Sequence, residues 1–468
     1  MAGVSKLVAA FTLAVAATPL TDATLRPEVD RLVAAVTAAR HLPFHGPLPA
    51  HALGPEEMRR AIALAVGEGT DNAATRTEGE LLKRLGLMPT GTGTGELAAQ
   101  AHAVATTPVA RYDAATATLL VPSSVPLGAQ REALAHEIAH AVADQRFGLR
   151  RFLRVAPDGG PRLDGDAERA RLALVEGDAM LAGLEVDDPR ENFLGTHALG
   201  ALAGRLRASS HPASDAAPSW FDELGQFTHV DGLLFVARVR AQRPWSAVDE
   251  LWNEPPVSSE QILHPEKYDA CEGAIAVDEA TLPALPGFGR PTASDVLGEL
   301  VVRTWLESAL PPEIAARAAT GWGGDRAGLY APGPPAPVAD GGAPMPTAPL
   351  AWLTVWDDAG EADDFARGAR QVLAKMSQTM SEASGAPATT GATDDREREA
   401  FPTPNGTFAL ARKGDAVALL LAAPEPVAPA LAVMLEAAHP RASRRAAPRP
   451  RRAAQPGCPR RDRAAGSG

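Results

Sequence analysis

Apolar residues recur every three or four positions along the first part of the chain, the spacing at which side chains share one face of a helix. Leu32, Val36 and Ala39 follow this spacing, and a Pro-Glu-Glu start signal at residue 55 begins a second helical pattern. These patterns predict that residues 25–70 are helical, and they predict another short helix at 78–88.

The pattern changes in residues 108–122, where two short β-prone runs flank a turn-forming segment at 113–115 and predict a hairpin. From about 127 to 148 the helical period returns, with a continuous apolar stripe. A second strong helix is predicted over 166–186, and two or three further helices follow up to about residue 254.

The C-terminal third alternates between helical and β-prone patterns. Helices are predicted at 290–320 and 361–381, a strand at 352–356, and a hairpin with two Gly-containing turns at 401–424. Beyond residue 440, Arg, Ala and Pro dominate, which is typical of a disordered tail. The whole pattern predicts an α+β fold that is mainly helical.

Composition excludes several classes of protein. Of the 468 residues, 45% are hydrophobic and 22% are charged, which excludes wholesale disorder. The net charge of −12 argues against a nucleic-acid partner, although nine Arg and one Asp crowd into residues 441–463. Two cysteines, Cys271 and Cys458, are too few for a disulfide scaffold or a Cys-rich metal site.

The N-terminus resembles a secretory signal. Lys6 precedes an apolar run from Leu7 to about Ala17, and small residues follow it. This predicts a secreted or cell-envelope (periplasmic) protein. The alternative is an Ala-rich helix that begins the fold of a cytoplasmic protein. No run of 18 apolar residues occurs, so we expect no transmembrane segment.

The segment His136-Glu137-Ile138-Ala139-His140 is an H-E-x-x-H motif within one of the predicted helices. Residues four apart lie on the same face of a helix, one turn from each other. Two imidazoles can therefore converge on one Zn²⁺ ion, the expected cofactor. Glu137 lies beside that point and can accept a proton from the water that the metal activates.

A third ligand is needed. Ala143 and Arg146 stand where a longer motif would have Gly and His, so the metzincin pattern fails. The remaining source is a carboxylate from the helix at 166–186, which offers Glu168, Glu176, Asp178 and Glu185. We expect Glu176, because it follows an apolar run in which an unpaired carboxylate would be costly. The alternative is that Glu176 forms a plain salt bridge with an Arg.

Four blocks of the sequence resemble a known family. The string HEIAHAVADQRFGL resembles the active-site helix of thermolysin-like gluzincins, and the fuller pattern is closer to a little-characterised family of bacterial and archaeal envelope metallopeptidases. The blocks are His136–Gln145, Leu174–Ala179, Pro255–Tyr268 and Gly321–Arg326. The resemblance covers residues 80–425.

The resemblance implies that His136, His140 and Glu176 bind zinc and that Glu137 is the base. Thermolysin-like enzymes also place an Asp four residues after the ligand Glu, where it orients a ligand His, but this chain has Met180 there. Asp178 or Asp144 would then take that role, which a ligating imidazole usually requires. The alternative for Asp144 is a solvated carboxylate at the end of its helix.

The developing oxyanion also needs a hydrogen-bond donor. The candidates are His229, His264, Tyr268 and Arg326, and for each the alternative is a purely structural role. We select His229 and His264 as the catalytic candidates besides Glu137. Trp322, Trp352 and Trp356 are expected in the core rather than as a platform for substrate.

Together these features predict a zinc-dependent peptidase, an endopeptidase rather than an exopeptidase, that acts on peptides or proteins. One alternative is a catalytically inactive, metal-stabilised binding protein of the envelope, and another is a structural helical protein with an accidental motif. The expected segments are a signal peptide at 1–22, an N-terminal helical region at 23–105, a zincin-like catalytic domain at 106–285, a C-terminal α+β region at 286–425 and a basic low-complexity tail at 426–468.

Overall fold

The computed structural model describes residues 20–70, 73–89, 110–155, 162–187, 194, 196–209, 220–331, 348–384 and 398–438. The predicted signal peptide and the Arg-rich tail beyond 438 therefore lie outside the described residues, apart from the last few positions of the former. The chain has an α+β fold that is 59% helical. None of the helices in these ranges is both long enough and apolar enough to cross a bilayer.

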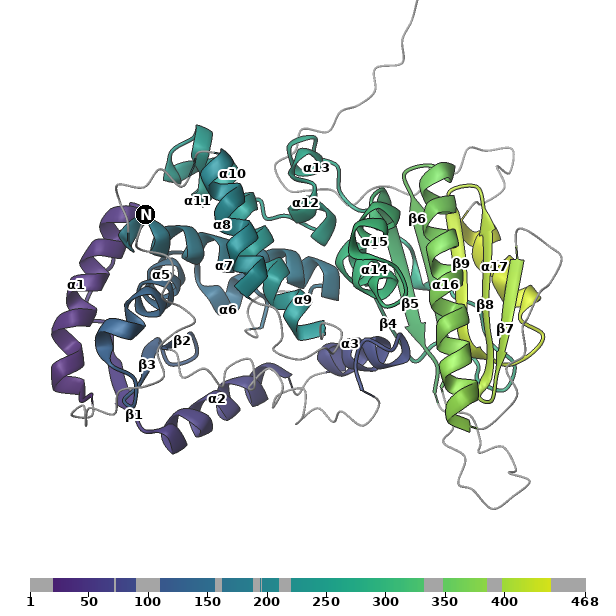
Figure 1. Cartoon of the computed structure of the whole chain (residues 1–468), viewed down its shortest axis with the longest axis horizontal. Helices are drawn as coiled ribbons and strands as arrows, with labels where there is room; N and C mark the ends of the chain where they lie inside the picture. Colours follow the sequence, from purple (N-terminus) through teal and green to yellow (C-terminus); the bar gives the residue numbers. More distant parts are fainter. Residues whose placement is uncertain are drawn as a thin grey trace, which may run out of the picture.

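A small three-stranded sheet lies at one end of the molecule (Figure 1). The predicted hairpin is present as β2 (Arg111–Asp113) and β3 (Thr118–Pro122), which pair antiparallel. The third strand, β1 (Ala50–Leu53), pairs parallel with β3 and falls within the segment predicted to be helical. The prediction was wrong there because the strand forms by pairing with a distant segment, which a local period does not reveal.

Two helices that were predicted at about 127–148 and 166–186 form the centre of the helical part, and their bounds differ from the prediction by one to four residues. They are α5 (Arg131–Phe147) and α7 (Gly165–Asp187), and they pack against each other (Figure 1). Helix α1 (Asp22–Arg40) packs on both, and α10 (Gly232–Gln242) packs on α7. The apolar stripe of α5, including Leu134, Ile138 and Val142, is fully buried. Gly148 ends α5 in the left-handed conformation.

Shorter elements surround these helices. In chain order they are α2 (Pro55–Thr70), α3 (Ala73–Arg84), η1 (Leu127–Gln130), α6 (Leu149–Phe152), α8 (Thr196–Ser209), α9 (Trp220–Gln226), η2 (Phe227–Asp231), α11 (Trp245–Asn253), α12 (Ser259–Leu263), α13 (Pro265–Asp269) and η3 (Glu279–Thr281). The element η2 is a π-helical turn, inserted between α9 and α10.

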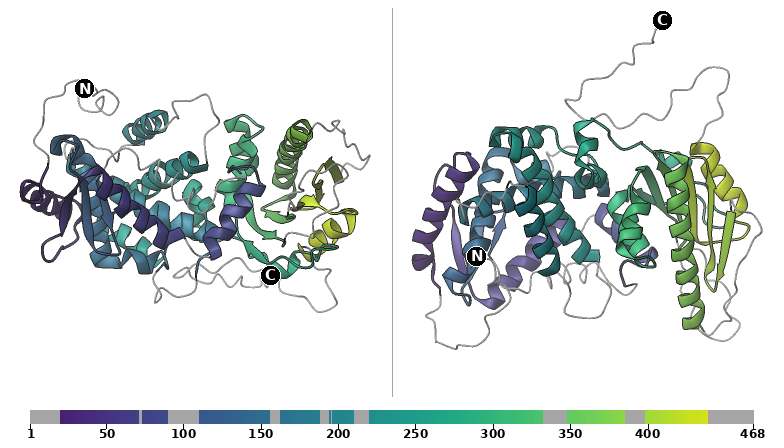
Figure 2. Two further views of the ribbon diagram at one scale, coloured as in Figure 1. Left: turned by 90° about the horizontal axis from the view of Figure 1, so that it is seen from below. Right: turned by 45° about the horizontal axis from the view of Figure 1, so that its top comes forward.

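The C-terminal part is a six-stranded antiparallel sheet in the order β4-β5-β6-β9-β8-β7. Its elements are β4 (Ala293–Asp295), α14 (Gly298–Glu307), α15 (Pro312–Ala319), β5 (Trp322–Leu329), β6 (Leu350–Trp356), α16 (Ala359–Ser384), β7 (Arg398–Thr403), β8 (Gly406–Lys413), β9 (Ala416–Ala423) and α17 (Ala428–Ala438). Figure 2 shows this sheet and the helical part at opposite ends of the molecule.

The two faces of this sheet belong to different cores. Trp352 and Trp356 pack with Phe365 of α16 on one face, whereas Leu353 packs with Met434 of α17 on the other. This alternation is the period of two that strands require. As predicted, Trp322, Trp352 and Trp356 are buried in the core.

The boundary of the basic tail needs a correction. It was predicted from residue 426, but α17 (Ala428–Ala438) is a helix that buries Leu431, Met434 and Leu435 against the sheet. Its apolar positions make it part of the core, so the tail begins after this helix. Most of the Gly321–Arg326 block forms strand β5 of the C-terminal sheet.

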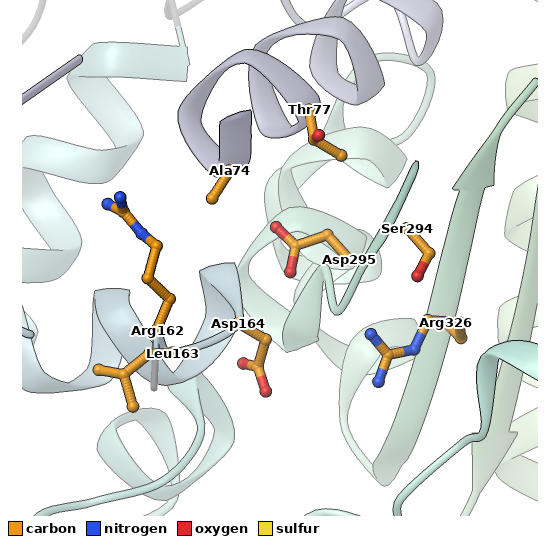
Figure 3. A pocket seen from close by; sticks show the side chains of 8 residues that line it. All are labelled: Ala74, Thr77, Arg162, Leu163, Asp164, Ser294, Asp295 and Arg326. Carbon is orange, nitrogen blue, oxygen red and sulfur yellow. The ribbon is translucent and has the colours of Figure 1, made fainter. Parts of the chain in front are cut away.

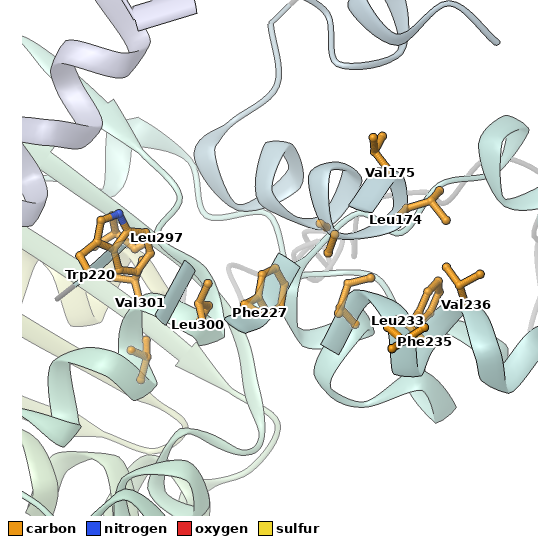
Figure 4. Close-up of a cluster of buried hydrophobic side chains, with 14 of the residues drawn as sticks. Leu174, Val175, Trp220, Phe227, Leu233, Phe235, Val236, Leu297, Leu300 and Val301 are labelled. Atoms are coloured by element: carbon orange, nitrogen blue, oxygen red, sulfur yellow. The ribbon is translucent and has the colours of Figure 1, made fainter. Parts of the chain in front are cut away.

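The helical part and the C-terminal part are joined at the beginning of α7. The backbone N–H of Gly165 donates to Asp295, and the Arg169 guanidinium donates to the carbonyl of Leu297. Figure 4 shows the apolar side of this junction, where Phe227 lies between side chains of α7 and side chains of α14. Helix α7, which carries the predicted third ligand, therefore contacts both the helical part and the C-terminal part.

Candidate metal centre

Helix α5 brings its two motif imidazoles together. The Nε2 atoms of His136 and His140 lie 3.0 Å apart, and the two rings meet edge to face with centroids 4.6 Å apart. Both side chains are largely buried, with exposed fractions of 16% and 10%. The helix thus points both Nε2 atoms at one place beneath the surface.

Helix α7 supplies a carboxylate at the same place. The Oε2 atom of Glu176 lies 3.2 Å from Nε2 of His136 and 3.3 Å from Nε2 of His140. Adjacent donor atoms around a tetrahedral zinc ion, bound at about 2.0–2.1 Å, are separated by roughly 3.3 Å. The three atoms therefore have the mutual spacing of ligands around one such ion.

The histidines and the carboxylate of this group shift each other's pKa. Burial by itself would lower the pKa of His140, but the carboxylate of Glu176 outweighs burial and raises the pKa to about 9. Burial would raise the pKa of Glu176, but the imidazoles of His140 and His229 hold that pKa well below its usual range. The carboxylate is thus ionised and His140 holds a proton beside it, and a metal ion bound at this place would take the position of that proton.

A third imidazole reaches the same carboxylate from the π-helical turn η2. Nε2 of His229 lies 3.4 Å from Oε2 of Glu176, and its ring stacks on that of His136 with centroids 6.0 Å apart. Ligand atoms of His136, Glu176 and His229 all lie within 4.8 Å of one another. The sequence singled out His229 only as a candidate oxyanion donor, since the extra residue of a π turn leaves no signal in the apolar period.

Two glycines allow this approach. A Cβ atom on Gly177 would lie 2.2 Å from the carbonyl oxygen of Gly232, and a Cβ on Gly232 would lie 2.1 Å from that of Ala173. The backbone of α7 is therefore in direct contact with Gly232, the first residue of α10, which directly follows η2. Only glycine at both positions permits it, which gives a physical reason for the Gly in the L-V-E-G-D-A block.

Glu137 is held by the neighbouring edge strand. Its Oε2 accepts a hydrogen bond of 2.7 Å from the backbone N–H of Tyr112 in β2. The hydroxyl of the same tyrosine donates to Asp144, 2.7 Å away, two turns further along α5. Tyr112 of β2 thus hydrogen-bonds to α5 at two positions and holds the Glu137 side chain next to the candidate ligand His136.

The two proposed supports for the ligand histidines have other partners. Asp144 accepts hydrogen bonds from the Tyr112 hydroxyl and from the backbone N–H of Leu149. Asp178 accepts from the buried Arg40 guanidinium at 2.6 and 2.9 Å, and from Nε1 of Trp252 at 2.8 Å. Neither carboxylate hydrogen-bonds to a ligand imidazole, and Nδ1 of His136 is buried without a partner among the described residues. Sequence reasoning missed Arg40, because nothing local links it to Asp178.

The other candidate oxyanion donors have structural partners. Nε2 of His264 lies 2.8 Å from the Glu299 carboxylate, and the Tyr268 hydroxyl donates to the carbonyl of Glu254. Nε of Arg326 donates to the carbonyl of Val277, and its side chain lines a cavity of about 350 Å³. Figure 3 shows this cavity beside Asp164 and Asp295, and no side chain of the metal centre lines it. Of the four candidates, the structure places only His229 at the predicted ligands.

Comparison with known proteins identifies one region. Residues 286–432 match the model of a domain of unknown function, DUF8575. No curated protein and no solved structure matches the chain. The matched residues form the C-terminal sheet and its helices, whereas His136, His140, Glu176 and His229 all precede them. The comparisons therefore describe the C-terminal region and give no activity to the metal centre.

Proposed function

We propose that the protein is a zinc-dependent peptidase of the gluzincin type, with a zincin-like catalytic core in its helical part. The observation that carries the proposal is the convergence of His136, His140 and Glu176, with donor atoms 3.0–3.3 Å apart. Two neutral imidazoles and one carboxylate suit Zn²⁺ and are the ligand set of metallopeptidases that keep one position open for catalysis.

The residues around this centre have the roles that hydrolysis needs. Zinc, when bound, would activate a water molecule and polarise the carbonyl group of a peptide. Glu137 directly follows His136 on α5, and its second carboxylate oxygen is not used by Tyr112. It is the group that would take the proton from the attacking water and pass it to the leaving amine.

The first test separates catalysis from metal binding. Glu137→Gln should retain about one zinc per chain and lose the cleavage of unfolded casein, because the amide cannot accept the proton. Glu132→Gln changes an exposed glutamate on the same helix and should cleave casein at the wild-type rate. His140→Ala should lose the zinc, and a chelator should abolish cleavage by the wild type. Casein cleavage by Glu137→Gln at the wild-type rate would contradict the role of this residue.

A second function is favoured by one observation. His229 adds a fourth donor next to Glu176, and four protein ligands are typical of structural zinc sites. The same residues would then stabilise a binding protein of the cell envelope that has no catalytic activity. Zinc binding without casein cleavage, in wild type and Glu137→Gln alike, is the result that this function predicts.

We also propose export, on the strength of the N-terminal segment discussed above. The experiment is fractionation of cells that express the full chain, followed by N-terminal sequencing of the mature protein. A new N-terminus near residue 22 in the envelope or medium supports export. An intact Met1 in the cytosol contradicts it.

A further inference from the structure

We infer that His229 is a fourth zinc ligand in the resting protein and that it closes the metal centre until a substrate displaces it. The inference rests on the proposed function, because it concerns the same zinc ion. It goes beyond that function by giving the centre a closed and an open state. In the closed state the zinc ion would have no open position, and a substrate such as casein would have to displace His229 before cleavage.

The first argument is distance. Nε2 of His229 lies 3.4 Å from Oε2 of Glu176, close to the separation of roughly 3.3 Å between adjacent ligands of tetrahedral zinc. Oε2 of Glu176 is therefore within ligand spacing of three imidazole nitrogens at once.

The second argument is the tautomer of His229. The Thr228 hydroxyl has one proton, and it lies 3.0 Å from the carbonyl oxygen of Leu224 and 3.3 Å from that of Gly225. It can therefore accept from Nδ1 of His229, which also lies 3.0 Å from the Gly225 carbonyl. With its proton on Nδ1, a neutral imidazole presents a lone pair on Nε2. Ligating histidines are commonly held in this way by a backbone carbonyl.

When Nε2 carries no proton, it faces the carboxylate oxygen of Glu176 as a second acceptor, and a cation between the two atoms would remove their repulsion. A Zn²⁺ ion bound by His136, His140 and Glu176 supplies that cation. A donor to an oxyanion would instead need its proton on Nε2, the nitrogen that the contacts to Thr228 and Gly225 leave without one. The hydrogen bonds on Nδ1 therefore favour a ligand over an oxyanion donor in the resting state.

The third argument is that the His229 side chain is the easiest of the four proposed ligands to displace from the metal. Its side chain is 47% exposed, against 10–17% for the other three ligands. It lies in η2, a five-residue π turn between two α-helices, and such turns are frequent at functional sites. The other three ligands lie within the long helices α5 and α7. Displacement of the His229 side chain would therefore leave both long helices in place, whereas displacement of any other ligand would not.

X-ray absorption at the zinc edge counts imidazole ligands and tests the inference without any measurement of activity. The zinc-loaded wild type should show three imidazoles, and His229→Ala should show two. His197→Ala removes an exposed histidine of α8 and is the matched control, with three imidazoles expected. Two imidazoles in the wild type would overturn the closed centre and leave the three-ligand peptidase standing. A wild type that binds no zinc would overturn both.

A second measurement tests displacement in solution. Acetohydroxamic acid binds zinc through two oxygens and needs the position that His229 occupies. If the open state is populated at about 10% or less, His229→Ala should bind it at least about tenfold more tightly than the wild type and the control. Equal affinities would show that His229 does not close the centre. The wild-type absorption spectrum decides the question by itself if His229→Ala does not fold.

Discussion

Substitution of Gly177 by alanine tests the contact that brings His229 to the candidate metal centre. The new Cβ would lie 2.2 Å from the Gly232 carbonyl oxygen, whereas an ordinary contact is at least 3.4 Å, so the two backbones must separate by about 1.2 Å. The neighbouring atoms are backbone, which cannot swing aside as a flexible side chain can. Overpacking of this kind costs about 1–3 kcal/mol of unfolding free energy.

The same displacement acts on the site. A shift of about 1.2 Å is more than half the length of a zinc–nitrogen bond of roughly 2.0–2.1 Å, so His229 should no longer reach a metal held by α5 and α7. Gly177→Ala should therefore lose both stability and one imidazole ligand, while His136 and His140 still bind. Urea denaturation measures the first effect, and X-ray absorption of the zinc-loaded protein measures the second.

Gly200 provides the control. It lies in α8, and a Cβ there would meet no atom within 4 Å, so alanine should stabilise the protein by up to about 1 kcal/mol through its higher helix propensity. The reasoning fails if Gly177→Ala is as stable as Gly200→Ala and keeps three imidazoles. The close backbone contact would then have no consequence for the site.

Three further predictions concern the surroundings of the centre. Tyr112→Phe removes the hydrogen bond from the hydroxyl to Asp144 and should lower the unfolding free energy by about 1–2 kcal/mol in urea denaturation. The kcat for casein should fall with KM unchanged, because only the contact between β2 and α5 weakens. An unchanged kcat would count against this role. Arg40→Met leaves Asp178 as a buried carboxylate without its cation and should cost about 3–5 kcal/mol, again by denaturation, and a loss under 1 kcal/mol would contradict it. Burial raises the pKa of Asp325 to about 6, so the folded state holds this proton more tightly than the unfolded chain does. The stability of the wild type relative to Asp325→Asn should fall by up to about 3 kcal/mol as the pH rises from 4 to 7, and a difference that does not vary with pH would refute this.

Where the sequence predicts the structure well, the information is local. The apolar stripe that includes Ile138 marks α5 and places the motif histidines on one face. The apolar run before Glu176 marks α7 and identifies its largely buried carboxylate. The structure brings these three side chains within ligand spacing of one another, and the identity of the metal and the chemistry remain proposals.

Where the prediction fell short, the information is non-local. Strand β1 exists only through its pairing with β3, and its own residues do not announce it. The role of Asp178 depends on Arg40, which lies far away in the first helix of the described chain. The residues around the motif therefore could not show that Asp178 pairs with Arg40 rather than with a ligand histidine. Helix α17 was assigned to the tail because the Arg-rich residues that follow it dominate the composition. The position of His229 depends on the π turn η2, which the apolar period of the sequence does not reveal.

The central claim is that one zinc ion is held by His136, His140 and Glu176. Crystals of the zinc-loaded protein, measured on both sides of the zinc absorption edge, test it most directly. The account predicts a single anomalous peak at about 2.0–2.1 Å from Nε2 of both histidines and from a carboxylate oxygen of Glu176. A zinc-loaded crystal with no peak there, or with its peak on other residues, would contradict the account.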